Sequence, residues 1–322
     1  MIARPIAGLV ATCGVALGLA VLPAACASAQ AGQGAPGVAP GRVAVDTGGL
    51  RRALDSLASA HHGTVGYAVF DVDGGTRMSR RGDETFPTAS LIKVSVLVTV
   101  FDLVAQRKLS LDDRLTVLRI DKVGGSGQLQ YLHDGAEITV QDAAWLMSTL
   151  SDNTATNLLL DRIIIRRVWD KMEALGLKHT KVHSKTFLRS SSVAMDSSVR
   201  YGLGVTTPNE MATLFELLAR GRAVNPVADS AMLDILEHNV DDQMLQRFAA
   251  GTRAAHKTGA TDAVRAECSL FYLASRVVAC VLTKENVDQR WAIDTEPQVT
   301  MARMGEAIVK TWGPPPASKT TP

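Results

Sequence analysis

The spacing of apolar residues near the start of the chain predicts one helix followed by a pair of strands. Leucines recur with the spacing of one helix face over residues 47–61, which predicts a first helix. The apolar run 65–70 predicts a strand. Asp-Gly-Gly at 73–75 is typical of a tight turn, so we expect a return strand over 76–80.

The longest apolar stretch runs from residue 91 to residue 109. Valines at every second position over 94–100 favour a strand, but the stretch is too long for a typical strand. We therefore predict a helix that is buried nearly all round. In a helix Ser90 and Lys93, three residues apart, share a face, whereas in a strand they face opposite sides.

The middle of the chain has a helical pattern with interruptions. Residues 139–150 predict a helix whose start lacks the glutamate or glutamine of a capping box. Ser-Asp-Asn at 151–153 interrupts the pattern, which then resumes. Residues 178–205 are weakly patterned and predict a long loop, a feature that is often functional. Thr207 starts the next helix, with Glu210 completing its capping box.

The end of the chain is rich in predicted strands. Lys-Thr-Gly-Ala at 257–260 begins this region, and the apolar runs 268–273 and 277–282 predict a hairpin. Residues 301–312 predict a final amphipathic helix. We therefore predict an α+β fold of three layers (α/β/α), in which one antiparallel sheet is built from both chain ends, is flanked by helices and has an all-helical part inserted.

The first residues have the composition of a secretory signal peptide. Arg4 precedes an apolar stretch over 6–22, and Ala-Ser-Ala at 27–29 is a small-x-small cleavage site. We therefore expect an exported protein, periplasmic or secreted. A transmembrane anchor is the alternative for the apolar stretch, and lipid attachment at Cys26 is the alternative to simple cleavage.

Changes in composition predict the boundaries of the parts. A stretch rich in glycine, alanine and proline follows the signal, and consecutive prolines end the folded region. The predicted parts are a signal peptide (1–29), a flexible linker (30–45), one folded domain (46–313, with an α/β part at 46–85 and 251–313 and a helical part at 86–250) and a proline-rich tail (314–322).

Composition excludes some classes of protein. The chain has 322 residues, a formal net charge of +2 and 5% aromatic residues, so neither charge nor base-stacking side chains point to nucleic acid. His133 and His183 have no partner at metal-ligand spacing, and we predict no metal and no cofactor. Cys268 and Cys280 lie on the two hairpin strands, and a disulfide and two buried free thiols are both open.

Ser90 and Lys93 place a hydroxyl and an amine together at the start of the buried helix. Burial disfavours the charged form of a lysine and lowers its pKa. A lysine that is neutral part of the time takes a proton from a serine, which becomes a nucleophile. One such pair is a weak signal, but two further motifs follow: Ser151-Asp152-Asn153 and Lys257-Thr258-Gly259.

The three motifs in this order resemble those of the class A serine β-lactamases and the related penicillin-binding proteins. The resemblance covers nearly all of the chain after the signal. It implies that Ser90 attacks a carbonyl and becomes acylated, that Lys93 shuttles the proton, and that Ser151 passes a proton to the leaving amide nitrogen. It also implies that Lys257 supplies positive charge near Ser151 and near the substrate carboxylate.

The resemblance also implies binding roles. The N–H groups of Ser90 and Ala260 are expected to form an oxyanion hole, and Ala260 is expected on an edge strand to which a substrate adds. Arg265, on the following strand, is either a second carboxylate anchor or a plain surface charge, and both remain open. The residues expected to bind substrate are Asn153, Thr258, Gly259 and Arg265.

The sequence departs from the family in the loop over 178–205. Class A enzymes carry Glu-x-x-Leu-Asn there, and the glutamate activates the water that frees the acyl-enzyme. No such pattern occurs between Gly176 and Thr206, and its expected position falls at residues 184–186. Asp196 is the only carboxylate in this loop, and we predict that it substitutes as the deacylating base.

Three functions fit these observations. The first is an exported serine β-lactamase with slow deacylation. The second is an enzyme that penicillin acylates but whose own substrate is a D-alanyl-D-alanine peptide or an ester. The third is a non-catalytic protein that binds a ligand at the same site. The expected partner is a small molecule, the expected state is a monomer, and membrane contact is expected only if Cys26 is lipidated.

Overall fold

The computed structural model describes residues 45–314. The predicted signal peptide (1–29), the linker up to residue 44, Cys26 and the tail after residue 314 lie outside the described residues. Between residues 45 and 314 there is no helix of the length and apolarity needed to span a bilayer. The same residues contain no group of three or more histidine, cysteine, aspartate or glutamate side chains that could hold a metal ion.

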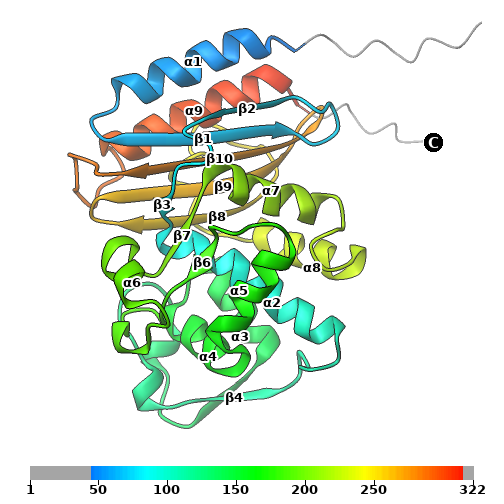
Figure 1. Ribbon diagram of the computed structural model, residues 1–322, viewed down its shortest axis with the longest axis vertical. Coiled ribbons are helices and arrows are strands. Elements are labelled where there is room, and N and C mark those ends of the chain that lie inside the picture. The colour runs from blue at the N-terminus through cyan, green and yellow to red at the C-terminus, as the bar shows by residue number, and fades with distance from the viewer. Residues whose placement is uncertain (1–44, 315–322) are drawn as a thin grey trace, which may run out of the picture. The chain divides into compact units, whose positions relative to one another are not determined.

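A five-stranded antiparallel sheet with the order β2-β1-β10-β9-β8 lies at the centre of the fold (Figure 1). Two strands come from the beginning of the described chain and three from its end, which confirms the predicted sheet shared by both ends. β8 is an edge strand, as expected for the strand that carries Ala260. The strands are β1 (Thr64–Asp71), β2 (Arg77–Arg80), β8 (Ala254–Thr261), β9 (Val264–Tyr272) and β10 (Arg276–Lys284).

Helices cover both faces of this sheet (Figure 1). α1 (Thr47–Ala60) and α9 (Glu296–Trp312) pack against one face, where they share a core with Tyr67 and Val69. Ala68, between them in the chain, points to the other face and to the larger core formed with the inserted helices. Alternate residues of a strand face opposite sides, so a sheet buried on both faces is apolar throughout.

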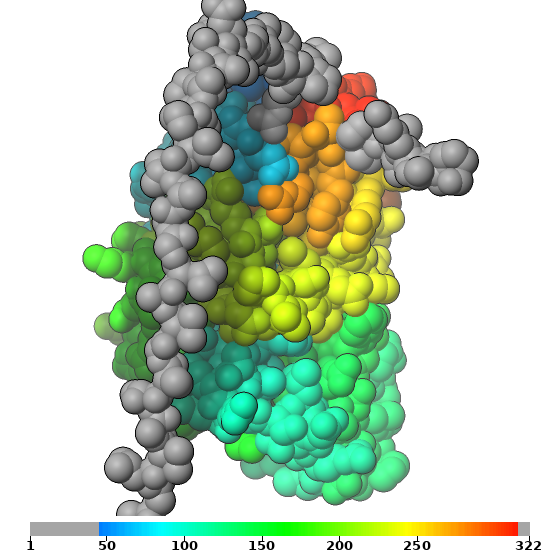
Figure 2. Space-filling view, turned by 90° about the vertical axis from the view of Figure 1, so that its right-hand side faces the viewer, coloured from blue at the N-terminus to red at the C-terminus, as the bar shows by residue number. Residues whose placement is uncertain are grey.

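The helix that follows Ser90 is central to the inserted region. α2 (Lys93–Ala105) is helical despite its alternating valines, and its first nine residues are all buried. Contacts with α3, α4, α5 and α8 surround it, which accounts for its apolar composition. Figure 2 shows the cyan and green atoms of this part of the chain below the yellow and orange atoms of the C-terminal strands. The other helices are α3 (Val140–Thr149), α4 (Asn153–Ile163), α5 (Ile165–Ala174), α7 (Pro208–Ala219) and α8 (Pro226–Glu237).

Two helix starts differ from the prediction. At α3 the Asp142 carboxylate accepts from the Thr139 N–H at 2.9 Å, and Thr139 Oγ1 accepts from the Asp142 N–H at 3.0 Å, so an aspartate closes the capping box. At α7 the predicted box is wrong. The Glu210 N–H donates to Thr207 Oγ1 at 3.1 Å, but the Glu210 carboxylate accepts from the His179 N–H at 3.0 Å and ties the helix to the preceding loop.

The stretch predicted as one long loop contains short elements. β7 (Gly204–Thr206) pairs with β6 (Lys181–Val182) and with β3 (Phe86–Pro87), which directly precedes the Ser90 turn. α6 (Met195–Tyr201) lies between β6 and β7 in the chain. Elements this short carry no periodic signal. The remaining elements are the pair β4 (Arg114–Val117) and β5 (Ala136–Thr139) and the 3-10 helices η1 (Ala89–Ile92), η2 (Arg119–Asp121), η3 (Leu129–Tyr131) and η4 (Arg189–Ser191).

Cys268 and Cys280 are opposite each other in the β9–β10 ladder and are joined by a disulfide. Both sulfurs lie in the larger core, on the face of the sheet toward the inserted helices. Lys257 of β8 is the register partner of Cys268. One of the two cysteines therefore lies on the strand next to the one that carries the third motif, and of the two alternatives left open by the sequence the structure shows the disulfide.

Candidate active site

Ser90 lies on η1, between β3 and α2. Its neighbours on this turn are buried, whereas Ser90 is half-buried, so its hydroxyl is the side chain of η1 that solvent can reach. Ala89 has a φ of 44°, in the left-handed region that residues with a side chain rarely adopt. Strained backbone of this kind clusters at functional sites, and here it directly precedes an accessible hydroxyl.

Lys93 is fully buried at the start of α2. The turn before it is a 3-10 helix rather than the predicted α-helix, and residues three apart are eclipsed in a 3-10 helix, so Ser90 and Lys93 keep a common face. Lys93 Nζ contacts the carbonyl oxygen of Ser151 at 2.7 Å, Oγ of Ser151 at 3.3 Å and Oδ1 of Asn153 at 2.8 Å. Among the described residues no hydrogen bond joins Lys93 to Ser90.

Burial holds the pKa of Lys93 well below that of an exposed lysine, and the positive charge of Lys257 lowers it further, while Asp152 acts in the opposite direction. A neutral amine donates two hydrogen bonds and accepts one. Its two N–H groups match the two amide-type oxygens at 2.7 and 2.8 Å. The lone pair then remains for a hydroxyl, so Lys93 can act as a base toward a serine.

The Ser151-Asp152-Asn153 turn joins α3 to α4. One of its side chains caps a helix, and others contact Lys93. The Asp152 carboxylate caps α4 by accepting from the Ala155 N–H at 2.8 Å, and it also accepts from the Gln128 N–H at 2.6 Å. Asn153 contacts Lys93 through Oδ1, and its Nδ2 donates to the Gly124 carbonyl at 3.0 Å. Its expected contact with a substrate amide stays a prediction.

The edge strand β8 packs its backbone directly on the Ser90 turn. A Cβ atom at Gly259 would lie 2.3 Å from the carbonyl oxygen of Thr88 and 2.9 Å from the N atom of Ser90. A Cβ atom does not come this close to a non-bonded heavy atom, so only glycine permits this approach. The requirement for Gly259 therefore comes from the close contact between the strand and the nucleophile.

The free edge of β8 faces the site. Lys257 Nζ donates to the carbonyl oxygen of Thr258 at 2.9 Å, so this carbonyl points away from the neighbouring strand. Backbone groups of a strand alternate in direction with a period of two residues, so the N–H of Ala260 points to the same free edge. The N atom of Ser90 lies close to Gly259, and the N–H of Ala260 belongs to the next residue of the same free edge; their role as an oxyanion hole stays a prediction.

Lys257 is the second buried amine of the site. Burial lowers its pKa to about 8, while the carboxylates of Asp241 and Glu267 act in the opposite direction. Its charge lowers the pKa of Lys93, so the two amines are within electrostatic reach of each other. Segments near residues 90, 151 and 257 therefore converge in one place.

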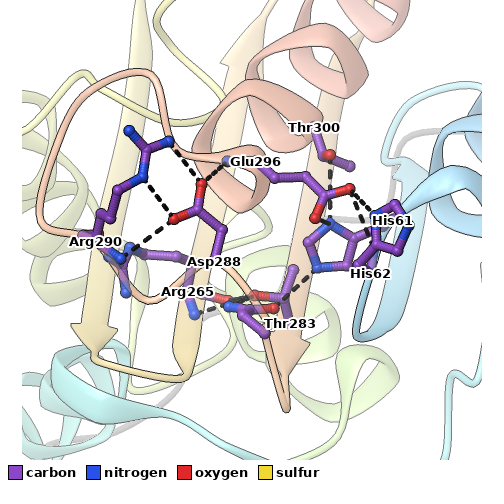
Figure 3. Close-up of polar contacts among 9 residues, drawn as sticks. His61, His62, Arg265, Thr283, Asp288, Arg290, Glu296 and Thr300 are labelled. Carbon is purple, nitrogen blue, oxygen red and sulfur yellow. Dashed lines mark hydrogen bonds and ion pairs between the residues drawn. The ribbon is translucent and has the colours of Figure 1, made fainter.

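The guanidinium of Arg265 donates hydrogen bonds to backbone carbonyl oxygens. It donates to the carbonyl oxygens of Val264 at 2.9 Å, of Thr261, and of Arg290 at 3.0 Å, and it lies 4.8 Å from the centre of the Trp291 ring. Figure 3 shows it beside the network that runs through Asp288 and Arg290 to Glu296 and His62. Arg265 is fully buried, so it is not a plain surface charge. A role as a substrate anchor stays a prediction.

Asp196 is exposed on α6, and within residues 45–314 its carboxylate has no hydrogen bond to the cluster around Ser90. Thr186, in the same loop, is hydrogen-bonded to Asn157 of α4, the helix that also carries Asn153. The Asn157 amide accepts from the Thr186 N–H at 2.7 Å and donates to the Thr186 carbonyl at 3.2 Å. Thr186 Oγ1 is the buried side-chain polar atom of the described chain that has no hydrogen-bond partner.

Two residues at the site belong to none of the three motifs, and they were not predicted from the sequence. Asn157 follows Asn153 by four residues and therefore lies on the same face of α4, a spacing that could have marked it. Asp241 hydrogen-bonds to Thr258 from a segment without a pattern, and no sequence signal indicates it. His183 is buried, and its Nδ1 donates to the Gly202 carbonyl at 3.1 Å.

Comparison with known proteins shows a family match. Residues 49–312 match the model of a family described as the beta-lactamase enzyme family. A beta-lactamase named AER-1 from Aeromonas hydrophila is 27% identical over 227 residues, which is 67% of this chain and 71% of that protein. A beta-lactamase named L2 from Stenotrophomonas maltophilia is 26% identical over 217 residues, which is 63% of this chain and 66% of that protein.

Solved structures agree in fold. The beta-lactamase from Sphaerobacter thermophilus superposes with a TM-score of 0.74 at 29% identity and covers 84% of this chain and all of that one. An ancestral class A beta-lactamase has a TM-score of 0.71 at 28% identity, covering 81% of this chain and 99% of that one. A protein named PBP-A, whose L158E mutant has been solved as an acyl-enzyme with penicillin G, has a TM-score of 0.72 at 25% identity, covering 82% and 96%.

Proposed function

Because the chain belongs to the beta-lactamase enzyme family, we propose that it cleaves β-lactam amides through an acyl-enzyme on Ser90 that is released slowly. The chain is a serine β-lactamase-like hydrolase of the class A superfamily. One convergence carries the proposal: Lys93 Nζ contacts Ser151, and Gly259, two residues after Lys257, packs on the backbone of Ser90.

Acylation begins with neutral Lys93 taking the hydroxyl proton of Ser90 while Oγ attacks the carbonyl carbon of the β-lactam. The N–H groups of Ser90 and Ala260 stabilise the negative oxygen that forms, and losing one such donor typically costs ~10²–10³ in rate. The ring C–N bond then breaks. The leaving nitrogen takes a proton from Ser151, which regains one from Lys93, so the amine ends neutral and Ser90 ends as an ester.

Release of the acyl group needs a water molecule and a group that takes its proton. General-base assistance typically contributes ~10²–10⁴-fold. In the part of the chain that the structure describes, no carboxylate hydrogen-bonds to Ser90, Lys93 or Ser151. We therefore expect the acyl-enzyme to accumulate, with Asp196 as the predicted base that limits its lifetime.

Intact-mass spectrometry after mixing the protein with penicillin G tests this proposal. The wild type is expected to gain one penicillin on Ser90 and to keep it for minutes or longer, and Ser90→Ala is expected to gain none. Absence of the adduct in folded wild-type protein would reject the proposal. An equal adduct lifetime in Asp196→Asn would eliminate Asp196 as the base.

A second function has a specific observation in its favour. The loop beside Asn157 carries no glutamate in the stretch 184–186, where the family's glutamate is expected, and PBP-A is among the structural relatives. An enzyme of this kind would be acylated by penicillin yet turn over a D-alanyl-D-alanine peptide or an ester. Steady-state hydrolysis of such a peptide or thioester, set against a chromogenic cephalosporin, separates the two. If a phenotype that depends on the protein in cells persists in the Ser90→Ala variant, a non-catalytic binding protein is favoured instead.

Export and the monomeric state are also part of our proposal, on the evidence of the sequence. Removal of residues 1–29 would leave Gln30 as the first residue of the mature protein. N-terminal sequencing of the mature protein is expected to begin at Gln30, whereas a lipidated form would begin at Cys26. Light scattering of the purified domain is expected to report one copy.

A further inference from the structure

A carboxylate of the chain itself lies at the edge strand that borders Ser90. Thr258 Oγ1 donates to Oδ2 of Asp241 at 2.8 Å. Thr258 lies between Lys257 and Gly259, the glycine whose backbone packs on the nucleophile turn. Asp241 is half-buried in the segment between α8 and β8. The strand to which a substrate would add therefore already carries an anionic partner.

Asp241 is held from the other side of the site as well. Its N–H donates to Oδ1 of Asn239 at 2.9 Å, and Nδ2 of Asn239 donates to the Ser148 carbonyl at 3.0 Å. Ser148 belongs to the last turn of α3, which leads to Ser151. Asp241 is thus held between the end of α3, which precedes the second motif, and β8, which carries the third motif.

The charge of Asp241 acts on the two buried cations of this region. Burial lowers the pKa of Lys257 and of Arg265, and Asp241 raises both. The positive field that these side chains would offer to an anion is therefore partly neutralised from within the chain. A hydroxyl donates one hydrogen, so a ligand carboxylate at Thr258 would also have to displace Asp241 from it.

We propose that Asp241 is a specificity-determining residue that disfavours substrates carrying a carboxylate beside the reacting amide and favours neutral acyl donors such as esters. The inference rests on the proposed acylation of Ser90. Like charge and an already occupied hydroxyl both act against the anion, which is discrimination by repulsion as well as by lost contacts. A charge-assisted hydrogen bond is worth enough to change affinity by about 10- to 100-fold.

The test compares two compounds that differ only in the carboxylate, penicillin G and its methyl ester. The rate of Ser90 acylation by each is measured by intact mass at pH 6.5, where Lys257 stays protonated. The variants are Asp241→Asn, Asp241→Ala as a second removal of the charge, and the exposed neighbour Asp242→Asn as a control with the same change in net charge.

Asp241→Asn is expected to raise the penicillin-to-ester ratio of acylation rates by about 10- to 100-fold, whereas Asp242→Asn leaves the ratio within about twofold of wild type. An unchanged ratio in both Asp241 variants, with Ser90 still acylated, would overturn this inference and leave the proposed function standing. Failure of both compounds to acylate Ser90 in wild type and variants would overturn the two together.

Discussion

Thr186→Glu is expected to turn a slowly released acyl-enzyme into a rapidly released one. The Asn157 amide holds the Thr186 backbone with contacts of 2.7 and 3.2 Å. Asn157 is one helical turn, about 5–6 Å, from Asn153, which contacts Lys93, so the residue that holds Thr186 shares a helix face with the Lys93 contact. The unpartnered Thr186 hydroxyl is of the kind that an ordered water normally satisfies.

The expected gain follows from what a well-placed general base contributes to deacylation. A carboxylate that reaches the attacking water contributes typically ~10²–10⁴-fold, so the acyl-enzyme lifetime is expected to fall by at least about 100-fold. Glutamate is larger than threonine, and a buried site of this kind loses ~1–3 kcal/mol when it is overpacked. For a domain of this size that cost lowers the Tm by roughly 2–4 °C per kcal/mol.

The assay is single-turnover decay of the penicillin adduct, followed by intact mass from a fixed ratio of protein to penicillin. Thr186→Gln is the matched control, because it has the shape of glutamate and no basic oxygen. Thr186→Val removes the hydroxyl alone. Thermal unfolding of each variant separates loss of the fold from loss of chemistry.

The reasoning is refuted if Thr186→Glu is acylated normally and keeps its adduct as long as the wild type does. It is also refuted if the glutamine control shortens the lifetime as much as the glutamate does, because a change of loop packing would then account for the effect. Shortening by glutamate alone places the deacylating water beside the loop that Asn157 holds.

Three further outcomes are expected. Gly259→Ala should slow acylation by about 10²–10³-fold, because its new Cβ would lie 2.3 Å from a backbone atom. Gly48→Ala, on the exposed face of α1, is the control and should not slow acylation; an equal effect of both substitutions would contradict the close packing of β8. With a pKa of about 8, Lys257 loses its charge above pH 8, so acylation by an anionic penicillin should fall about tenfold per pH unit there, and Lys257→Arg should remove that fall in a pH–rate profile. Replacing Cys268 and Cys280 by alanine should lower the free energy of unfolding by about 3 kcal/mol in urea titrations, and an unchanged midpoint would argue against the disulfide.

Local pattern was sufficient for most elements and for the chemical class. The helix after Ser90 follows from the length of its apolar run, although the valine alternation argues for a strand, because burial on every side overrides local preference. The hairpin that carries Cys268 follows from its two apolar runs, and the helix start at Thr207 follows from short-range cap chemistry. The capping aspartate at residue 142 and the elements inside residues 178–205 were missed, because their signals span too few residues.

By itself the amino-acid sequence determined the order of the elements, the nucleophile motif and the superfamily, because those depend on neighbours within a few residues. Only the tertiary structure decided that Gly259 packs on the Ser90 backbone, that Thr186 is held by Asn157, and that Asp241 occupies the Thr258 hydroxyl. Each of these contacts joins segments that are far apart in the chain. Their partners are selected by how helices and strands pack against one another, and no local period in the sequence records that choice.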